Sequence, residues 1–327
     1  MTPACLEAWK LASEPFQHTG LPLDPRARDT DLEHYFDFYS WLDTSAVGGL
    51  TPLGRIKSPG LTGGNRMLTL LISGPQGCGR SSLKNLLLFE LIQQAAQPPI
   101  VVEWPVTPSI NRAQNMVSLA RKLAQTAQAL DVGAGTALNT VIADWQKDQL
   151  VGQEPDIDYL FAQLRQDLQI HLPSSPVVVS LEALSHTLSR DTAYATSATL
   201  ESVADFVVLS LTNTDDAKIV RTSCINNGRP VALIEAPKVD LDTAKRLLSH
   251  HLRRLRAEAA ADELFPFTEP ALAVLFAGTD ARVQPSVSLP IRVALQKLSA
   301  ALTNKCQPGG GPPGPITAAD MRATLGV

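Results

Sequence analysis

Apolar residues follow two alternating patterns over the middle of the chain. Short runs rich in Val, Ile and Leu predict buried β-strands at 67–73, 99–104, 176–181, 205–211 and 230–235. Between these runs, apolar residues recur every three or four positions, which predicts helices near 80–95, 109–130, 155–170 and 195–204. Strands that alternate with helices are typical of a parallel sheet with helices on its faces. We therefore expect an α/β domain with a parallel five-stranded sheet over residues 67–237.

The strand pattern stops after Pro237. Helical spacing then predicts a small all-helical domain over 238–305, with helices at 241–259, 268–277 and 289–303. Asp240 or Asp242 is a suitable N-cap for the first of these helices. The segment 306–327 is predicted to be a Pro/Gly linker and a short C-terminal tail. In that tail, Thr317 and Asp320 resemble a capping box that opens a last short helix.

The segment 1–66 is rich in Pro, Gly, Asp and Thr, and we interpret it as a loop-rich N-terminal arm anchored by a short helix. Its concentrated apolar feature is an aromatic cluster made of Tyr35, Phe36, Phe38, Tyr39 and Trp41. Packing of this cluster against the main domain is the simpler interpretation. A docking surface for a partner is the alternative, because exposed aromatic side chains concentrate binding energy.

The composition is that of an ordinary globular protein rather than a disordered or fibrous one. The chain has 327 residues, of which 44% are hydrophobic and 18% charged. A formal net charge of -4 and a pI of about 5.9 give the protein as a whole no electrostatic reason to coat nucleic acid or an anionic membrane. Its apolar stretches are shorter than the roughly 20 residues that a membrane helix requires, so no membrane span is expected.

The cysteines and the first residues favour an intracellular protein. Neither a C-x-x-C pair nor metal-ligand spacing occurs among the four cysteines, which is consistent with free thiols in a reducing compartment: Cys5, Cys78, Cys224 and Cys306. Residues 1–16 mix charged and apolar positions, and they lack the basic start and the apolar core of a secretory signal. These features predict a cytoplasmic protein without a zinc site.

A glycine-rich loop separates the first predicted strand from the first predicted helix. It matches the phosphate-loop template G-x-x-x-x-G-K-[ST] at every fixed position except the lysine, and the predicted nucleotide-binding residues are Gly74, Pro75, Gln76, Gly77, Cys78, Gly79, Arg80, Ser81 and Ser82. Glycines let successive backbone N–H groups point inward, and the helix N-terminus adds a partial positive charge that favours phosphate. The Ser81 hydroxyl is predicted to bind a Mg²⁺ ion that bridges the outer phosphates. Cys78 fits the loop sterically, and a lowered thiol pKa near the helix N-terminus is the alternative reason for its presence.

Two positions depart from those of an efficient nucleotide hydrolase. Arg80 replaces the lysine of the template, and a planar guanidinium is wider than an ammonium group. The strand at 176–181 leads into Glu182, where a phosphate-loop protein places the acid that holds magnesium through water; a solvated carboxylate at the end of the strand is the alternative. The next residue is Ala183 rather than an acid that activates the attacking water. We therefore predict binding of ATP and Mg²⁺ with slow hydrolysis, or with a substitute for the missing acid elsewhere.

From about 67 to 303 the arrangement resembles the AAA+ ATPases and their signal-transducing relatives. The resemblance rests on the segments G-P-Q-G-C-G-R-S-S, V-V-V-S-L-E, V-V-L-S-L-T-N-T, N-G-R-P-V-A-L-I-E-A-P and L-F-P-F-T-E-P-A-L. It implies an adenine nucleotide, a helical domain that acts as a lid, and Asn213, or less favourably Thr212, as the residue that senses the γ-phosphate. It further implies that Arg229 is an arginine finger for a neighbouring subunit and that Arg292 is a lid arginine; isolated surface arginines are the alternative for both.

The function that these features favour is a nucleotide-dependent switch or scaffold that passes its state to a protein partner with little turnover. An oligomeric ATPase is one alternative, in which Arg229 from a neighbouring copy completes the site. A nucleic-acid-binding initiator or loader is another, less favoured one, because residues 245–256 form a concentrated basic stretch. A solvated helix face is the simpler interpretation of that stretch.

Overall fold

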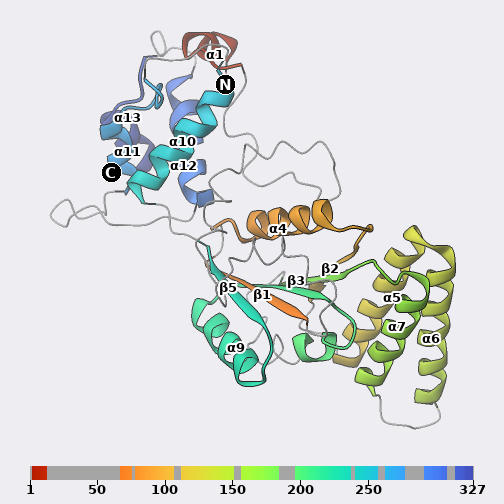
Figure 1. Cartoon of the computed structure of the whole chain (residues 1–327). Coiled ribbons are helices and arrows are strands. Elements are labelled where there is room, and N and C mark those ends of the chain that lie inside the picture. The colour runs from red at the N-terminus through yellow and green to blue at the C-terminus, as the bar shows by residue number, and fades with distance from the viewer. Residues whose placement is uncertain are drawn as a thin grey trace.

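The computed structural model describes residues 2–12, 67–75, 78–106, 112–150, 156–183, 196–236, 240–256, 262–276, 291–307 and 314–326. Its centre is a five-stranded sheet with the order β2-β3-β4-β1-β5, and all neighbouring strands are parallel (Figure 1). The strands are β1 (Leu68–Ser73), β2 (Ile100–Val106), β3 (Val177–Ala183), β4 (Phe206–Leu211) and β5 (Val231–Glu235). The predicted parallel five-stranded sheet is confirmed, and each strand begins within one residue of its predicted start.

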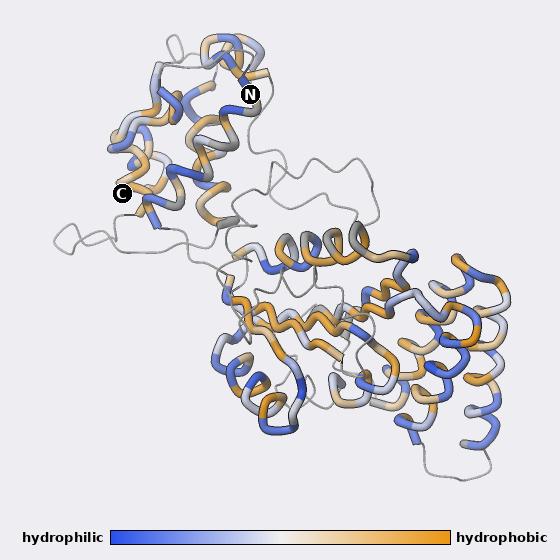
Figure 2. Tube along the Cα trace, viewed as in Figure 1, coloured by the Kyte–Doolittle hydropathy of each residue, from blue (hydrophilic) through white to orange (hydrophobic). Residues whose placement is uncertain are grey.

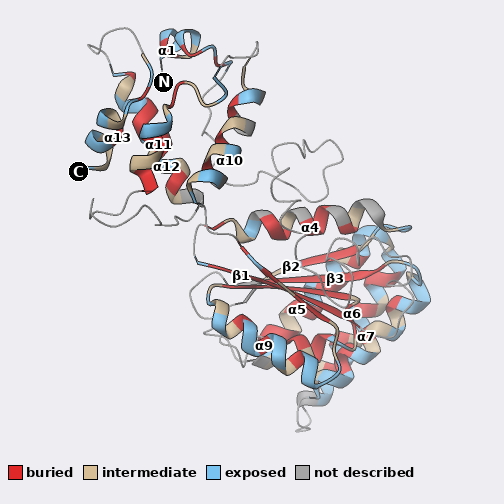
Figure 3. Ribbon diagram, turned by 60° about the vertical axis from the view of Figure 1, so that its left-hand side comes forward, coloured by how far each residue is buried: buried red, intermediate tan, exposed pale blue. Residues whose placement is uncertain are grey.

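Both faces of the sheet are covered, which is why its strands are almost continuously apolar. Every residue of β1 and β4 is buried, and Figure 2 shows the apolar residues gathered along the strands. Helix α4 (Arg80–Gln94) covers one face. The opposite face is covered by α5 (Arg112–Leu130), α7 (Ile157–His171) and α9 (Thr214–Asn226), and α6 (Val132–Leu150) packs against α5 and α7. Figure 3 shows the buried strands between α4 on one side and α9 on the other.

Helices α4, α5 and α7 confirm their predictions, whereas α6 and α9 were not predicted. Helix α6 begins at Val132 in a glycine-containing stretch that weakens the helical pattern. Its N-terminus is stabilised by Asp131, whose Oδ1 accepts a hydrogen bond from the Ala134 N–H at 2.6 Å. A Cβ at Gly135 would lie 2.3 Å from the Cβ of Gln128, so this glycine allows α5 and α6 to approach closely. Of the described part of the helix predicted at 195–204, residues 196–200 are helical and residues 201–203 form a turn.

Among the described residues after the sheet, four helices form a helical group: α10 (Leu241–Arg254), α11 (Glu269–Phe276), α12 (Ile291–Lys305) and α13 (Ala318–Leu325). Helix α10 begins directly after Asp240, so Asp240 rather than Asp242 holds the N-cap position. The N-terminal helix α1 (Pro3–Ala8) joins this group, and Figure 1 shows both ends of the chain in it. Trp9 is fully buried there and its Nε1 donates a hydrogen bond to the Gly314 carbonyl at 3.3 Å.

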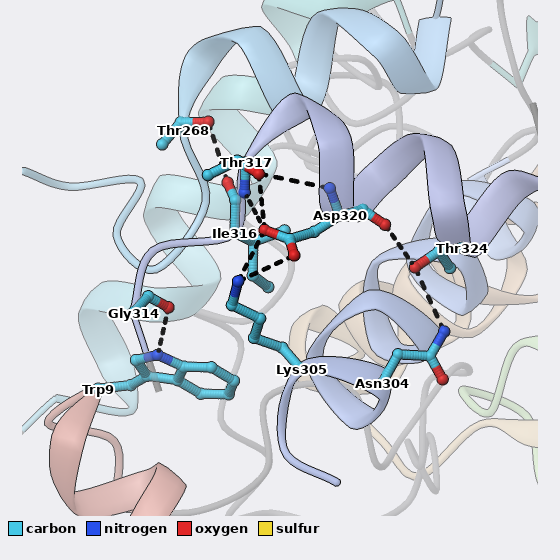
Figure 4. Close-up of polar contacts among 9 residues, drawn as sticks. All are labelled: Trp9, Thr268, Asn304, Lys305, Gly314, Ile316, Thr317, Asp320 and Thr324. Atoms are coloured by element: carbon cyan, nitrogen blue, oxygen red, sulfur yellow. Dashed lines mark hydrogen bonds and ion pairs between the residues drawn. The ribbon is translucent and has the colours of Figure 1, made fainter. Parts of the chain in front are cut away.

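The C-terminal tail is held in the helical group by polar contacts around Asp320 (Figure 4). Thr317 and Asp320 form the predicted capping box, which is thereby confirmed. The ammonium group of Lys305 donates to both carboxylate oxygens of Asp320, at 2.8 and 3.0 Å. Partial burial raises the pKa of Asp320, but the hydrogen bonds from Lys305 and Thr317 outweigh this effect and leave the pKa below its ordinary value. Ile316 and Met321 are fully buried, so this end of the chain contributes to the core of the group.

The expectation of four free thiols is wrong for two of the cysteines. Cys5 in α1 and Cys306 after α12 form a disulfide across 301 residues, with a Cα–Cα distance of 6.1 Å. Such a pairing leaves no local spacing signal, because the two residues are brought together only by the docking of α1. Cys78 and Cys224 are free and buried. The scattered positions of the cysteines suggested free thiols in a reducing compartment. The disulfide removes this argument for such a compartment.

Several sequence predictions fall outside the described residues. These are the aromatic cluster at 35–41, the loop residues Gln76 and Gly77, and most of the Pro/Gly-rich segment. None of the helices in the described ranges has both the length and the apolar character that a membrane span requires.

Candidate phosphate-binding site

The carboxyl ends of β1 and β4 mark the point where the chain leaves the sheet toward opposite faces. After β1 the chain enters α4 on one face, and after β4 it enters α9 on the other. The two strand ends are joined by a hydrogen bond from the Gly74 N–H to the Leu211 carbonyl, at 3.2 Å. In open α/β sheets, ligands bind in the crevice that forms outside the strand ends at such a switch point. The predicted glycine loop begins at this point.

The loop folds back tightly on itself. Gly74 has φ +148°, and a Cβ at this position would lie 2.7 Å from the Cys78 Sγ and 3.1 Å from the Ala236 Cβ. Gly79 has φ +93° and forms the N-cap of α4. Both positions therefore require glycine, one for close approach and both for a backbone conformation that side chains disfavour. This requirement explains both fixed glycines of the template.

The N-terminus of α4 is suited to an anion. No side chain caps it, and its first turn contains no acidic residue. By contrast, α7, α9 and α13 are each capped by a side chain and carry an acid in the first turn. At the N-terminus of α4, neither a capping side chain nor a first-turn acid therefore offsets the backbone N–H groups and the positive end of the helix dipole. This is the electrostatic arrangement that binds phosphate groups in proteins.

Arg80 and Ser81 occupy the first turn of α4, where Arg80 is half-buried and Ser81 is exposed. Cys78 is buried directly before the helix, and this burial raises the pKa of its thiol, although the charge and the hydrogen bonds of Arg80 oppose the shift. A lowered thiol pKa for Cys78 is therefore contradicted. Its close approach to Gly74 supports the steric role instead.

The predicted acid and the predicted sensor lie at the same carboxyl edge of the sheet as the loop. Glu182 is in register with Ser210 of β4, and Ser210 is in register with Ile72 of β1. At the usual spacing of about 4.8 Å between strands, the Glu182 backbone lies roughly 10 Å to the side of β1. Asn213 is exposed and follows β4, where its Oδ1 caps α9 by accepting the Asp215 N–H at 2.9 Å.

The two predicted arginines are placed differently. Arg229 precedes β5 and therefore lies at the amino edge of the parallel sheet, opposite the loop. Its Nε forms an ion pair with the Glu201 carboxylate at 2.6 Å, and its side chain is only 15% exposed. Arg292 lies in the first turn of α12, and its side chain falls outside the described set. The structure therefore does not bring Arg229 together with the loop of the same chain.

A buried lysine that the sequence analysis did not single out lies one helical turn after Arg80. Lys84 is only 6% exposed, and its Nζ lies 2.7 Å from the Glu103 Oε2 on β2. The signal that could have identified it is its position four residues after Arg80, on the same side of α4. Its charge is matched by Glu103, so Lys84 is not a simple replacement for the lysine of the template.

The basic stretch at 245–256 is partly neutralised within the chain. Lys245 pairs with Glu269, and Arg253 pairs with Glu263. The Arg256 guanidinium donates to the backbone carbonyl of Asp262. These contacts agree better with a solvated and internally paired helix face than with a surface that neutralises phosphates of a nucleic acid.

No group of three or more His, Cys, Asp or Glu side chains with metal-binding geometry occurs in the described ranges. Magnesium at nucleotide sites is commonly held by one or two protein oxygens together with phosphate oxygens and water. Ser81 and Glu182 lie at the same edge of the sheet. A hydroxyl and a carboxylate are oxygen ligands of the kind that this mode of binding uses.

Comparisons with known proteins find similarity in the fold only. No protein-family model matches the chain, and no curated protein matches its sequence. The structure is similar to that of Cdc6p from Pyrobaculum aerophilum, with 13% identity, a TM-score of 0.44, and coverage of 92% of this chain and 69% of that one. It is also similar to a katanin structure that concerns the structural basis for katanin self-assembly. That similarity has 12% identity and a TM-score of 0.36, and it covers 100% of this chain and 91% of that one. At these values neither likeness assigns a function to this chain.

Proposed function

We propose that this protein is an AAA+-like, ATP- and Mg²⁺-binding switch or scaffold that hydrolyses ATP weakly or not at all. The observation that carries the proposal is the N-terminus of α4, which lacks a capping side chain and an acid and lies directly behind a tight glycine loop at the switch point of the sheet. Backbone N–H groups bind the phosphates. Ser81 and Glu182 hold the magnesium ion, directly and through water respectively.

Weak turnover follows from the two departures from the phosphate-loop pattern. Arg80 supplies positive charge at the first residue of α4, but its planar fork binds oxygens differently from the compact ammonium of lysine. Ala183 ends β3 and has no group that could take a proton from an attacking water. Ground-state binding relies mainly on the backbone and survives these changes, whereas the transition state loses stabilisation.

The helical group is the element that reports the bound state to a partner. Strand β5 ends at Glu235 and α10 begins at Leu241, so the helical group follows closely after the sheet along the chain. Ala236 directly follows β5, and its N–H donates to the carbonyl of Ser73, the residue directly before the glycine loop, at 2.7 Å. A shift of the loop on nucleotide binding therefore acts on the residue from which the helical group departs.

The test is calorimetric titration of ATP and ADP, each with Mg²⁺, together with phosphate release from the same samples. Wild type is compared with Ser81→Ala and with the control Ser118→Ala, which removes a hydroxyl from α5 on the opposite face of the sheet. We expect wild type and Ser118→Ala to bind ATP with little phosphate release, and Ser81→Ala to bind more weakly in Mg²⁺. Absence of binding by wild type would overturn the proposal. Robust phosphate release that Ser81→Ala abolishes would instead identify a working ATPase.

A further inference from the structure

Two buried serine hydroxyls under α4 find no hydrogen-bond partner within the described part of the chain. They are the Oγ atoms of Ser180 on β3 and Ser210 on β4, and each residue is only 1% exposed. Each serine lies two residues after a valine, Val178 or Val208, that packs in the same cluster as the leucines of α4. Alternate residues of a strand share a face, so both serines are on the face that α4 covers.

A buried hydroxyl without a partner is costly, and its presence requires an explanation. Burial without a compensating hydrogen bond costs about 1–3 kcal/mol, so alanine at either position would be at least as stable. The two serines differ in their neighbours. Ser180 is in register with Glu103, whose carboxylate is already bound by Lys84. Ser210 is in register with Glu182, the last but one residue of β3.

Ser210 also lies between the two parts of the proposed site. On its other side it is in register with Ile72 of β1, two residues before Gly74. Residues in register on neighbouring parallel strands lie about 4.8 Å apart and share a face of the sheet. Ser210 therefore lies beside the Glu182 position on one neighbouring strand and beside the strand that leads into the glycine loop on the other.

We propose that Ser210 is a positioning residue whose hydroxyl donates a hydrogen bond to the Glu182 carboxylate when the site holds nucleotide and Mg²⁺. This hydrogen bond fixes the carboxylate in the orientation in which it holds the water ligands of the metal. The inference rests on the proposed function, since it concerns the same site. The proposal assigns the orientation of the Glu182 carboxylate to a residue within β4. This residue is distinct from the exposed Asn213, which follows the strand.

The experiment measures ATP affinity by calorimetry, with Mg²⁺ and with excess EDTA, for wild type, Ser210→Ala and Ser180→Ala. Ser180→Ala is the matched control, because it removes an equally buried hydroxyl from the same face. For Ser210→Ala we expect the gain in affinity due to Mg²⁺ to fall about tenfold, as for loss of a hydrogen bond to a charged group, with affinity in EDTA unchanged. Ser210→Thr keeps the hydroxyl and should restore the gain, and the urea midpoints of both alanine variants should equal or exceed that of wild type.

The outcomes separate this assignment from the function on which it rests. If wild type binds ATP with a gain from Mg²⁺ and Ser210→Ala shows the same gain, or if Ser180→Ala lowers it equally, Ser210 does not position the acid, while the nucleotide site remains. A clear loss of stability in Ser210→Ala would also overturn the assignment, because it would reveal a partner for the hydroxyl in the unloaded protein. If wild type binds no ATP, both the site and the role of Ser210 are refuted.

Discussion

Substitution of Gly74 by alanine tests the geometry of the loop directly. The added Cβ would lie 2.7 Å from the Cys78 Sγ, a separation that real Cβ contacts essentially never show, and 3.1 Å from the Ala236 Cβ. The φ of +148° adds backbone strain for any residue with a Cβ. Overpacking costs about 1–3 kcal/mol, and an unfavourable φ/ψ region costs about 1–3 kcal/mol. We expect Gly74→Ala to lower the free energy of unfolding by about 2–6 kcal/mol.

Gly228→Ala is the matched control for the backbone contribution. Gly228 also has a positive φ, +69°, but a Cβ there would meet no atom within 4 Å. Its substitution should cost only about 1–2 kcal/mol. The difference between the two variants therefore measures the crowding inside the loop rather than the loss of glycine as such.

Urea unfolding followed by far-UV circular dichroism gives both costs, and a double-mutant cycle with Cys78→Ala isolates the sulfur contact. Since Cys78→Ala removes the Sγ, Gly74→Ala should cost at least about 1 kcal/mol less in that background than in wild type. Equal costs for Gly74→Ala and Gly228→Ala, together with no coupling to Cys78, would refute the tight loop described here.

Other contacts give further predictions. Asp205→Ala should cost about 2–4 kcal/mol in urea unfolding, because Asp205 binds both terminal nitrogens of Arg165, at 2.9 and 3.1 Å, and accepts a backbone N–H at 2.8 Å; a cost as small as that of a surface substitution would contradict this. Cys5→Ser should destabilise the helical group by about 2–5 kcal/mol, because it removes the disulfide. Alkylation of unfolded, unreduced wild type should modify only the two free cysteines. Modification of all four cysteines would argue against the disulfide. Asp320→Asn should cost about 1 kcal/mol at neutral pH through the weakened capping box. Because the folded pKa of Asp320 is lowered, wild type should lose this advantage as the pH falls through that pKa, and a difference that persists in acid would contradict the assignment.

The elements that the sequence predicted well are those whose signal is local. Buried strands are continuous apolar runs wherever they lie in the sheet, so the span of β4 was predictable without knowing its neighbours. The capping box at Thr317 is likewise contained within four residues. The strand order, by contrast, depends on which runs pair, and no local pattern fixes the place of β4 between β1 and β3.

The features that were missed depend on contacts between distant residues. Helix α6 begins among glycines that look unfavourable until α5 is packed against Gly135. The pairing of Cys5 with Cys306 follows from docking of the N-terminal segment, which Trp9 anchors in the helical group. Ser210 can be linked to the proposed site only when its register with Glu182 is known. Each case requires the tertiary arrangement before the residue can be interpreted.

The residues of the proposed site form two sets: those whose backbone would bind phosphate and those whose side chains would support hydrolysis. The turns at Gly74 and Gly79 and the open N-terminus of α4 depend on the backbone, and all three have the form that phosphate binding requires. Arg80 and Ala183 stand where hydrolysis depends on particular side chains, and both differ from what it requires. Binding a ground state needs mainly the first set, whereas acceleration of phosphoryl transfer needs the second. This division supports the proposal that the protein holds a nucleotide rather than hydrolysing it.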